Sequence, residues 1–156
     1  MKRAAFILVW VLVSAAVCAS VDGPHDDAVP RPAATSPRFA FVDAYVDSKD
    51  QPLAAYQFEL TAQGSGVTLV GVEGGDAPAF AEPPYYDPKA NVQNRIIIAA
   101  FNTGANLPRG RTRVARVMVR LSGSAQTKWS AKLVVAASAD AKPINADIQV
   151  SQGETP

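Results

Sequence analysis

The sequence offers few residues that could perform covalent catalysis. It contains one cysteine, Cys18, and one histidine, His25, both near the amino terminus. Nucleophilic cysteine and serine systems need a histidine, or an equivalent base, beside the attacking group. Zinc sites need several cysteine or histidine ligands. These two residues cannot assemble either arrangement, so we expect no nucleophilic triad and no zinc centre.

Carboxylates are the remaining groups that could catalyse hydrolysis. Glycosidases place two of them about 5 to 9 Å apart across a sugar. The candidates fall on predicted strand faces and turns, where acidic residues are usually solvated: Asp43, Asp47, Glu59, Glu73, Asp76, Glu82 and Asp87. Asp47 and Asp140 could ligate calcium and His25 a metal beside Asp26 and Asp27, but no ordered calcium loop is recognisable. We predict a protein that is not an enzyme and holds no metal or cofactor.

Residues 79–88, AFAEPPYYDP, are the best candidate for binding. Prolines on both sides stiffen the segment around Tyr85 and Tyr86, and flat rings with a polar tip stack on sugars or anchor protein interfaces. We take Phe80, Tyr85 and Tyr86 as the candidate binding residues. The alternative is structural, with one tyrosine capping an edge of the fold and the other partly exposed.

Five arginines form a second candidate surface. Arg109, Arg111 and Arg113 share one parity along the chain, whereas Arg116 and Arg120 have the other. In a regular strand the two groups would point to opposite faces. The pattern therefore predicts no single basic stripe and little support for a groove that binds a polyanion. Positive residues on an edge strand also protect a sheet against aggregation.

The segments that could position these residues have the pattern of short strands. Ala54, Tyr56, Phe58 and Leu60 alternate with smaller or polar residues, which predicts a strand with one buried face. Gly64-Ser65-Gly66 is predicted to be a hairpin turn into a second strand over 67–72. Similar alternation marks 39–47, 111–121 and 129–137, and a last short strand is predicted over 146–150.

Two segments depart from this alternation. Residues 94–101 form a continuous apolar run, which predicts a strand buried on both faces. Residues 74–93 contain Gly74-Gly75 and several prolines, which predicts a long irregular loop. Since no window shows a helical apolar stripe, we predict an all-β, two-sheet sandwich of about seven to nine strands over residues 38–151, followed by a tail at 152–156.

The amino terminus has the pattern of a secretory leader. Lys2 and Arg3 precede an apolar run over 4–13, and small residues follow up to Ala19. The run is too short to span a bilayer, so residues 1–19 are predicted to be a signal peptide cleaved after Ala19. A retained membrane anchor and lipidation at Cys18 are the alternatives, but bulky Val17 fits a lipidation site poorly. The expected location is secreted, periplasmic or in the cell envelope, with no membrane contact after cleavage.

Residues 20–37 contain four prolines and almost no large apolar side chain, so they are predicted to be a disordered linker. Removal of the leader would leave no cysteine, and the domain would depend on its core alone. The whole chain has 15 basic and 14 acidic residues, and loss of Lys2 and Arg3 would bring the net charge to about −1. Such a balance gives no field that would favour nucleic acid.

The order of these segments resembles a cohesin domain, a secreted β-sandwich related to some cellulose-binding modules. The resemblance covers residues 39–151. It begins with FAFVDAYVDS, and LAAYQFEL resembles the cohesin strand of the form Gly/Ala-Phe-Gln-Phe-x-Leu. LPRG before the strand over 112–121, and ASADA leading into 144–150, resemble the later cohesin strands. The resemblance implies a jelly-roll sandwich that binds a dockerin module on one sheet face, or serves as a scaffold beside enzymes of polysaccharide catabolism.

We therefore expect a secreted, non-enzymatic module that binds a protein partner, such as a dockerin-type domain, in an extracellular or envelope assembly. A carbohydrate-binding module that uses the tyrosines as a stacking platform is the first alternative. A structural envelope protein without a binding site is the second.

Overall fold

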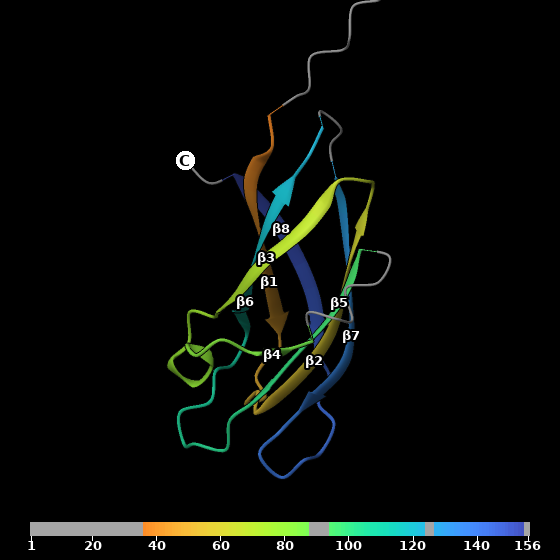
Figure 1. Cartoon of the computed structure of the whole chain (residues 1–156). Helices are drawn as coiled ribbons and strands as arrows, with labels where there is room; N and C mark the ends of the chain where they lie inside the picture. Colours follow the sequence, from red (N-terminus) through yellow and green to blue (C-terminus); the bar gives the residue numbers. More distant parts are fainter. Residues whose placement is uncertain (1–35, 88–93, 124–126, 155–156) are drawn as a thin grey trace, which may run out of the picture. The chain divides into compact units, whose positions relative to one another are not determined.

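The computed structural model describes residues 36–87, 94–123 and 127–154. The predicted leader and most of the predicted linker, with Cys18 and His25, lie outside the described residues. The described part is an all-β sandwich of eight strands in two four-stranded antiparallel sheets, as predicted (Figure 1). Within that part, no helix has the length and apolar character needed to cross a membrane.

The first sheet, here called sheet A, has the strand order β3-β6-β1-β8. Its strands are β1 (Arg38–Asp47), β3 (Val67–Gly74), β6 (Arg111–Leu121) and β8 (Asp147–Glu154). The second sheet, sheet B, has the order β4-β5-β2-β7. Its strands are β2 (Ala55–Gln63), β4 (Tyr85–Tyr86), β5 (Arg95–Phe101) and β7 (Lys128–Ala137). Strand β8 continues to Glu154, so most of the predicted tail belongs to the fold.

The core lies between the inner faces of the two sheets. Strand β1 turns four small apolar side chains inward with none of their surface exposed: Ala40, Val42, Ala44 and Val46. Tyr56, Phe58 and Leu60 of β2 meet them from the opposite sheet. The alternating pattern assigned Tyr56, Phe58 and Leu60 to one buried face, and that prediction is confirmed. Burial of apolar surface of this kind is the main force that holds such a fold together.

The two strands in residues 53–73 do not form the predicted hairpin. Strand β2 belongs to sheet B and pairs with β5 and β7, whereas β3 belongs to sheet A and pairs with β6. The turn therefore carries the chain from one sheet to the other, with Gly64 and Gly66 at positive φ. Alternation specifies which face of a strand is apolar, but it does not specify whether two such strands pair edge to edge or pack face to face.

Strand β5 is buried on one face only, so the prediction that both faces are buried is wrong. Ile96 and Ile98 point into the core, but Phe101 is 80% exposed and Ile97 is 37% exposed. Strand β7 also departs from its predicted alternation. A bulge shifts its register against β2 between Gln57 and Phe58, so that Val135 lies opposite Gln57 on the outer face of sheet B. These two departures place apolar side chains in solvent on the two strands that flank β2.

Candidate binding face

The structure separates the three predicted binding residues. Tyr85 pairs with Ala99 and Tyr86 with Ile98, so a short strand interrupts the predicted irregular loop. Because neighbouring side chains of a strand point to opposite faces, Tyr86 packs against the core while Tyr85 is 76% exposed. Phe80 ends the short 3-10 helix η1 (Pro78–Phe80) and is 3% exposed. One of the three rings is therefore available at the surface.

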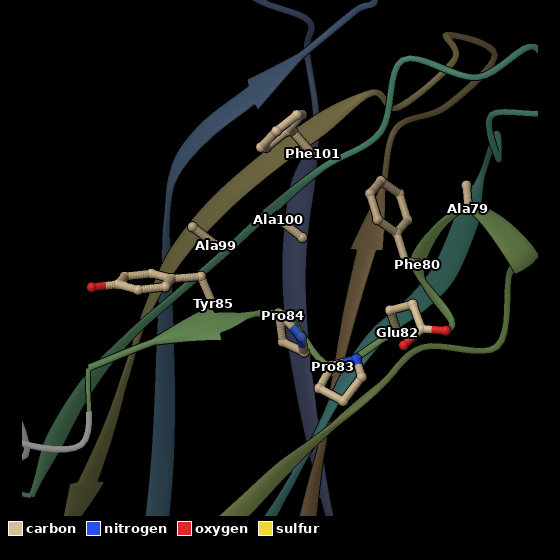
Figure 2. A pocket seen from close by; sticks show the side chains of 9 residues that line it. All are labelled: Ala79, Phe80, Glu82, Pro83, Pro84, Tyr85, Ala99, Ala100 and Phe101. Atoms are coloured by element: carbon tan, nitrogen blue, oxygen red, sulfur yellow. The ribbon is translucent and has the colours of Figure 1, made fainter.

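Two prolines come directly before the short strand β4, and a hollow lies between them and β5. Pro83 and Pro84 precede Tyr85, and proline has no N–H to donate to a neighbouring strand. A pocket of about 220 Å³ lies between this segment and residues 99–101 of β5. Figure 2 shows the rings of Tyr85 and Phe101 on one side of this pocket and the ring of Phe80 on the other. The pocket is lined mostly by carbon.

Two rows of side chains cross the outer face of sheet B next to this pocket. The first row runs from Phe101 through Ala55 to Ala137, and the second runs from Tyr85 through Ala99 and Gln57 to Val135. We call these seven residues the apolar face. Gln57 is the one residue of these seven with an amide side chain. The two aromatic residues pair with alanines, Tyr85 with Ala99 and Phe101 with Ala55. Sequence reasoning missed Phe101 and Val135, because their exposure depends on the pairing of β5 and on the bulge in β7.

Two further hollows continue the apolar face toward β7. One, of about 200 Å³, is lined by Phe101 and Ala55 together with residues of the turn after β7. The other, of about 370 Å³, is lined by Val134, Val135 and residues 143–144. Phe101 borders the first two hollows, and Ala137 borders the last two. The surface is therefore a continuous, shallow band with three depressions into which a partner's side chains could fit.

The five arginines of the second candidate surface are arranged differently from the prediction. Strand β6 has a bulge, at which Ala44 faces Ala115 and Tyr45 faces Arg113, so that Val114 is the additional residue. Val114 and Ala115 are both fully buried.

The bulge reverses the parity, and four arginines share the outer face of sheet A: Arg111, Arg113, Arg116 and Arg120. The prediction that they form no single stripe is wrong for these four. Arg109 lies apart, in the loop before β6, and donates to the Asp50 carbonyl.

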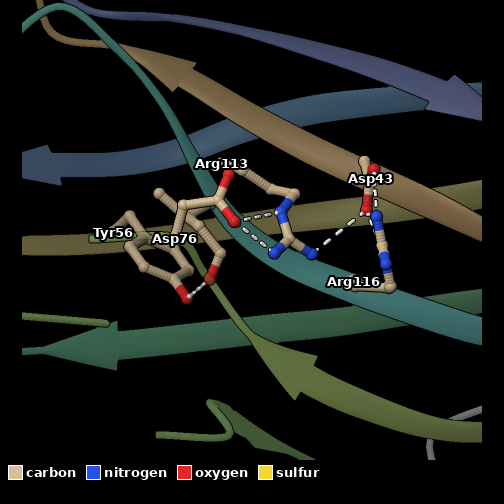
Figure 3. Close-up of polar contacts among 6 residues, drawn as sticks. Asp43, Tyr56, Asp76, Arg113 and Arg116 are labelled. Atoms are coloured by element: carbon tan, nitrogen blue, oxygen red, sulfur yellow. Dashed lines mark hydrogen bonds and ion pairs between the residues drawn. The ribbon is translucent and has the colours of Figure 1, made fainter. Parts of the chain in front are cut away.

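Three contacts hold the bulge in place. The Tyr56 hydroxyl crosses the sandwich and donates to the Val114 carbonyl at 2.8 Å, and burial raises the pKa of Tyr56 (Figure 3). The Asp76 amide donates to the Arg113 carbonyl at 3.0 Å. Gly75 lies so close to the same carbonyl that a Cβ atom there would overlap it. A bulge leaves backbone groups outside the regular ladder, and the tyrosine satisfies one of them.

Two of the four arginines in this stripe, Arg113 and Arg116, form ion pairs within the protein. Asp43 accepts from Arg116 at 2.7 and 2.9 Å and lies 3.4 Å from Arg113. Arg113 also donates to Asp76, which holds the pKa of that carboxyl below its usual value. The guanidinium groups of Arg111 and Arg116 lie over the rings of Tyr45 and Phe41, at 3.6 and 4.1 Å from the ring centres. These contacts favour a structural role for the stripe over polyanion binding.

The carboxylates named above as possible catalysts are spread over both sheets. Asp43 is engaged by arginines, and Glu59 accepts from Arg95 at 2.7 Å. Among residues 36–87, 94–123 and 127–154, no three or more His, Cys, Asp or Glu side chains come together to hold a metal ion. The apolar face on sheet B, by contrast, brings two exposed aromatic rings and three hollows together on one surface.

Comparison with known proteins adds no relative from which a function could be transferred. The chain matches no protein-family model and no curated protein.

Proposed function

We propose that this chain is a secreted, non-enzymatic, cohesin-like module that binds a protein partner through the apolar face of sheet B. The observation that carries the proposal is the exposure of Tyr85 and Phe101 on one continuous sheet surface, at 76% and 80%. Monomeric proteins rarely leave contiguous apolar surface of this kind in water unless it serves an interaction. The secreted location rests on the pattern of residues 1–19.

The composition of the face suits a protein partner. Ala55, Ala99 and Ala137 keep the surface low beside the two aromatic rings, so a partner could approach the sheet closely. Aromatic residues surrounded by small contacts are the usual centres of binding energy in protein interfaces. The three depressions beside the face would receive partner side chains. The resemblance to cohesin domains, which bind through a sheet face, supports the same choice.

The proposal is tested by affinity capture with purified dockerin-type domains and with envelope proteins, followed by calorimetry on each retained partner. We expect Phe101→Ala and Tyr85→Ala each to weaken binding about tenfold or more, because each removes an exposed aromatic anchor. Phe39→Ala is the matched control, since Phe39 is 53% exposed but lies on the outer face of sheet A.

The control should change the dissociation constant by less than about twofold, as surface substitutions outside an interface do. All three variants should unfold at the same temperature as the native chain, because none of these rings belongs to the core. Equal loss of binding in Phe39→Ala, or no loss in Phe101→Ala and Tyr85→Ala, would show that the apolar face is not the binding surface.

A carbohydrate ligand is the second candidate, favoured by the two exposed rings on one flat surface. Sugar recognition also needs hydrogen-bonding groups around the stacking platform, and Gln57 is the one side-chain amide in the two rows. Polysaccharide pull-down and glycan arrays separate the two functions. Sugar retention that is lost in Tyr85→Ala would favour a carbohydrate-binding module.

A further inference from the structure

The outer face of sheet B changes from apolar to mainly charged and polar side chains along its strands. At one end lie the two rows of the apolar face. Toward the other end most outward-facing residues are charged or polar, with Glu59 opposite Lys132, Thr61 opposite Arg95 and Gln63 opposite Lys128, and Ile97 is the apolar exception. We call Arg95, Lys128 and Lys132, together with Glu59, the basic end of the face.

The charges at the basic end are not balanced among themselves. Glu59 is the one carboxylate of the four, and it is engaged by Arg95 at 2.7 Å. Lys128 and Lys132 are exposed and make no ion pair with any residue that the structure describes. They stand four residues apart on the same side of β7, roughly 13 Å along the strand. Glu59, which lies opposite Lys132 in the pairing of β2 with β7, is the one carboxylate among these four residues, so the basic end carries a net positive charge.

We propose that the partner presents an apolar surface flanked by carboxylates, with its apolar groups over Tyr85, Phe101 and Val135 and its carboxylates over Lys128 and Lys132. This inference rests on the proposed function and specifies the chemistry of the partner. Charge complementarity fixes the orientation of the partner along the strands and raises the association rate. It also selects against partners that carry basic groups at the same position.

A second copy of this chain fits the face poorly. A two-fold axis parallel to the strands would place the basic end of one copy on the basic end of the other. An axis across the strands would place the lysines on the partner's apolar rows, where their charge would be buried without compensation. Both arrangements are unfavourable, so the face is suited to a different protein.

The inference is tested with two extended peptides that differ only in charge: both have a leucine-rich half, followed by a glutamate-rich half in one and a lysine-rich half in the other. Each peptide is titrated into the isotope-labelled full chain, and the backbone amide shifts are followed by NMR. We expect the acidic peptide to bind about tenfold more tightly or better, with shifts centred on β5 and β7, and the preference to shrink as salt is added.

The double variant Lys128→Glu/Lys132→Glu should reverse the preference in favour of the basic peptide. Both lysines are exposed, so this variant is expected to fold, and its thermal unfolding checks this. Arg120→Glu is a charge-reversal control on the outer face of sheet A, and it should keep the preference for the acidic peptide. A preference that survives the double variant would overturn the inference.

Two other outcomes separate this inference from the proposed function. If both peptides bind the apolar face equally and Phe101→Ala weakens both, the face binds apolar partners but the charge requirement is wrong. If neither peptide shifts the amides of sheet B, both proposals fail. Binding to vesicles containing phosphatidylglycerol that is lost in the double variant, without any peptide preference, would replace the protein partner by an anionic membrane.

Discussion

At the scale of single residues, Tyr56 connects the two sheets through its hydroxyl group. Its ring lies in the core, with Phe80 packed edge-on at 5.1 Å between ring centres, and its hydroxyl donates to the carbonyl of the bulge residue Val114. A buried acceptor that loses its donor costs more than the hydrogen bond itself contributed, because the acceptor stays out of contact with water. The bulge in β6 therefore depends on one side chain from the opposite sheet.

The first stability prediction follows from this contact. Tyr56→Phe should lower the free energy of unfolding by about 1–3 kcal/mol, because it leaves the Val114 carbonyl buried without its donor. Urea unfolding followed by fluorescence measures the change. Tyr85→Phe removes a hydroxyl from an exposed ring and should change the stability by less than about 0.5 kcal/mol. Equal stability of the two variants would show that the inter-sheet hydrogen bond is unimportant.

Asp76 makes stability depend on pH in the acidic range. The hydrogen bond from Arg113 lowers the pKa of Asp76 below the ordinary value of 3.8. A carboxyl group whose pKa is lower in the folded state stabilises the fold above its unfolded pKa, and this contribution is lost as the pH falls through the folded pKa. Asp76→Asn should therefore lower the stability near neutral pH and lose its effect well below pH 4.

Unfolding curves measured across the acidic range test this dependence. The effect of Asp76→Asn should also disappear in an Arg113→Gln background, because the interacting cation is then absent. If the free energies of unfolding of the native chain and of Asp76→Asn differ by the same amount down to low pH, the prediction is wrong.

At the scale of elements, the bulge in β6 and the segment after β3 fit together closely. Gly75 follows β3 and its Cα lies against the Arg113 carbonyl and the Val114 backbone, with no room for a Cβ atom. Because backbone atoms of a core strand cannot move aside as a flexible side chain can, a larger residue would displace either the bulge or the segment leading to η1. That segment carries Asp76 and Phe80, so both contacts would be disturbed.

Gly75→Ala should therefore lower the free energy of unfolding by about 1–3 kcal/mol or more, as overpacking at a rigid site does. Gly71→Ala is the control. Gly71 lies within β3, and a Cβ atom at that position meets nothing within 4 Å. This control should leave the stability unchanged or slightly raised, since alanine loses less backbone entropy on folding. Thermal unfolding of both variants measures the difference, and similar losses in the two would argue against a specific close approach.

At the scale of the whole sandwich, the outer faces of the two sheets differ in how their side chains are satisfied. Arg113 and Arg116 of sheet A are paired with Asp43 and Asp76, and Arg111 lies over Tyr45, so three of the four arginines on that surface have partners within the protein and Arg120 stays exposed. Sheet B leaves two large rings and two lysines without such contacts among the described residues. For this reason, the binding predictions concern residues of sheet B, and the stability predictions concern residues around the bulge in sheet A.

Much of the architecture could be predicted from the sequence, because alternation of apolar and polar residues reflects the geometry of a strand directly. The inward residues of β2 were identified this way, and so was the two-sheet sandwich. The candidate site was predicted only in part. Tyr85 is exposed as expected, but Phe80 and Tyr86 pack toward the core, and Phe101 was not considered because it ends an apolar run that was expected to be buried.

What the sequence by itself determined is local: which segments are strands, which side chains of β2 face inward, and where turns interrupt them. The tertiary structure decided which strands are neighbours and where the register shifts. The bulges at Val114 and Val134 reverse the parity of the residues beyond them, and this places four arginines on one face and turns Val135 to the outer face of sheet B, opposite Gln57. The physical reason is that a bulge is stabilised by contacts from distant segments, such as the Tyr56 hydroxyl, and leaves no reliable mark in the local pattern.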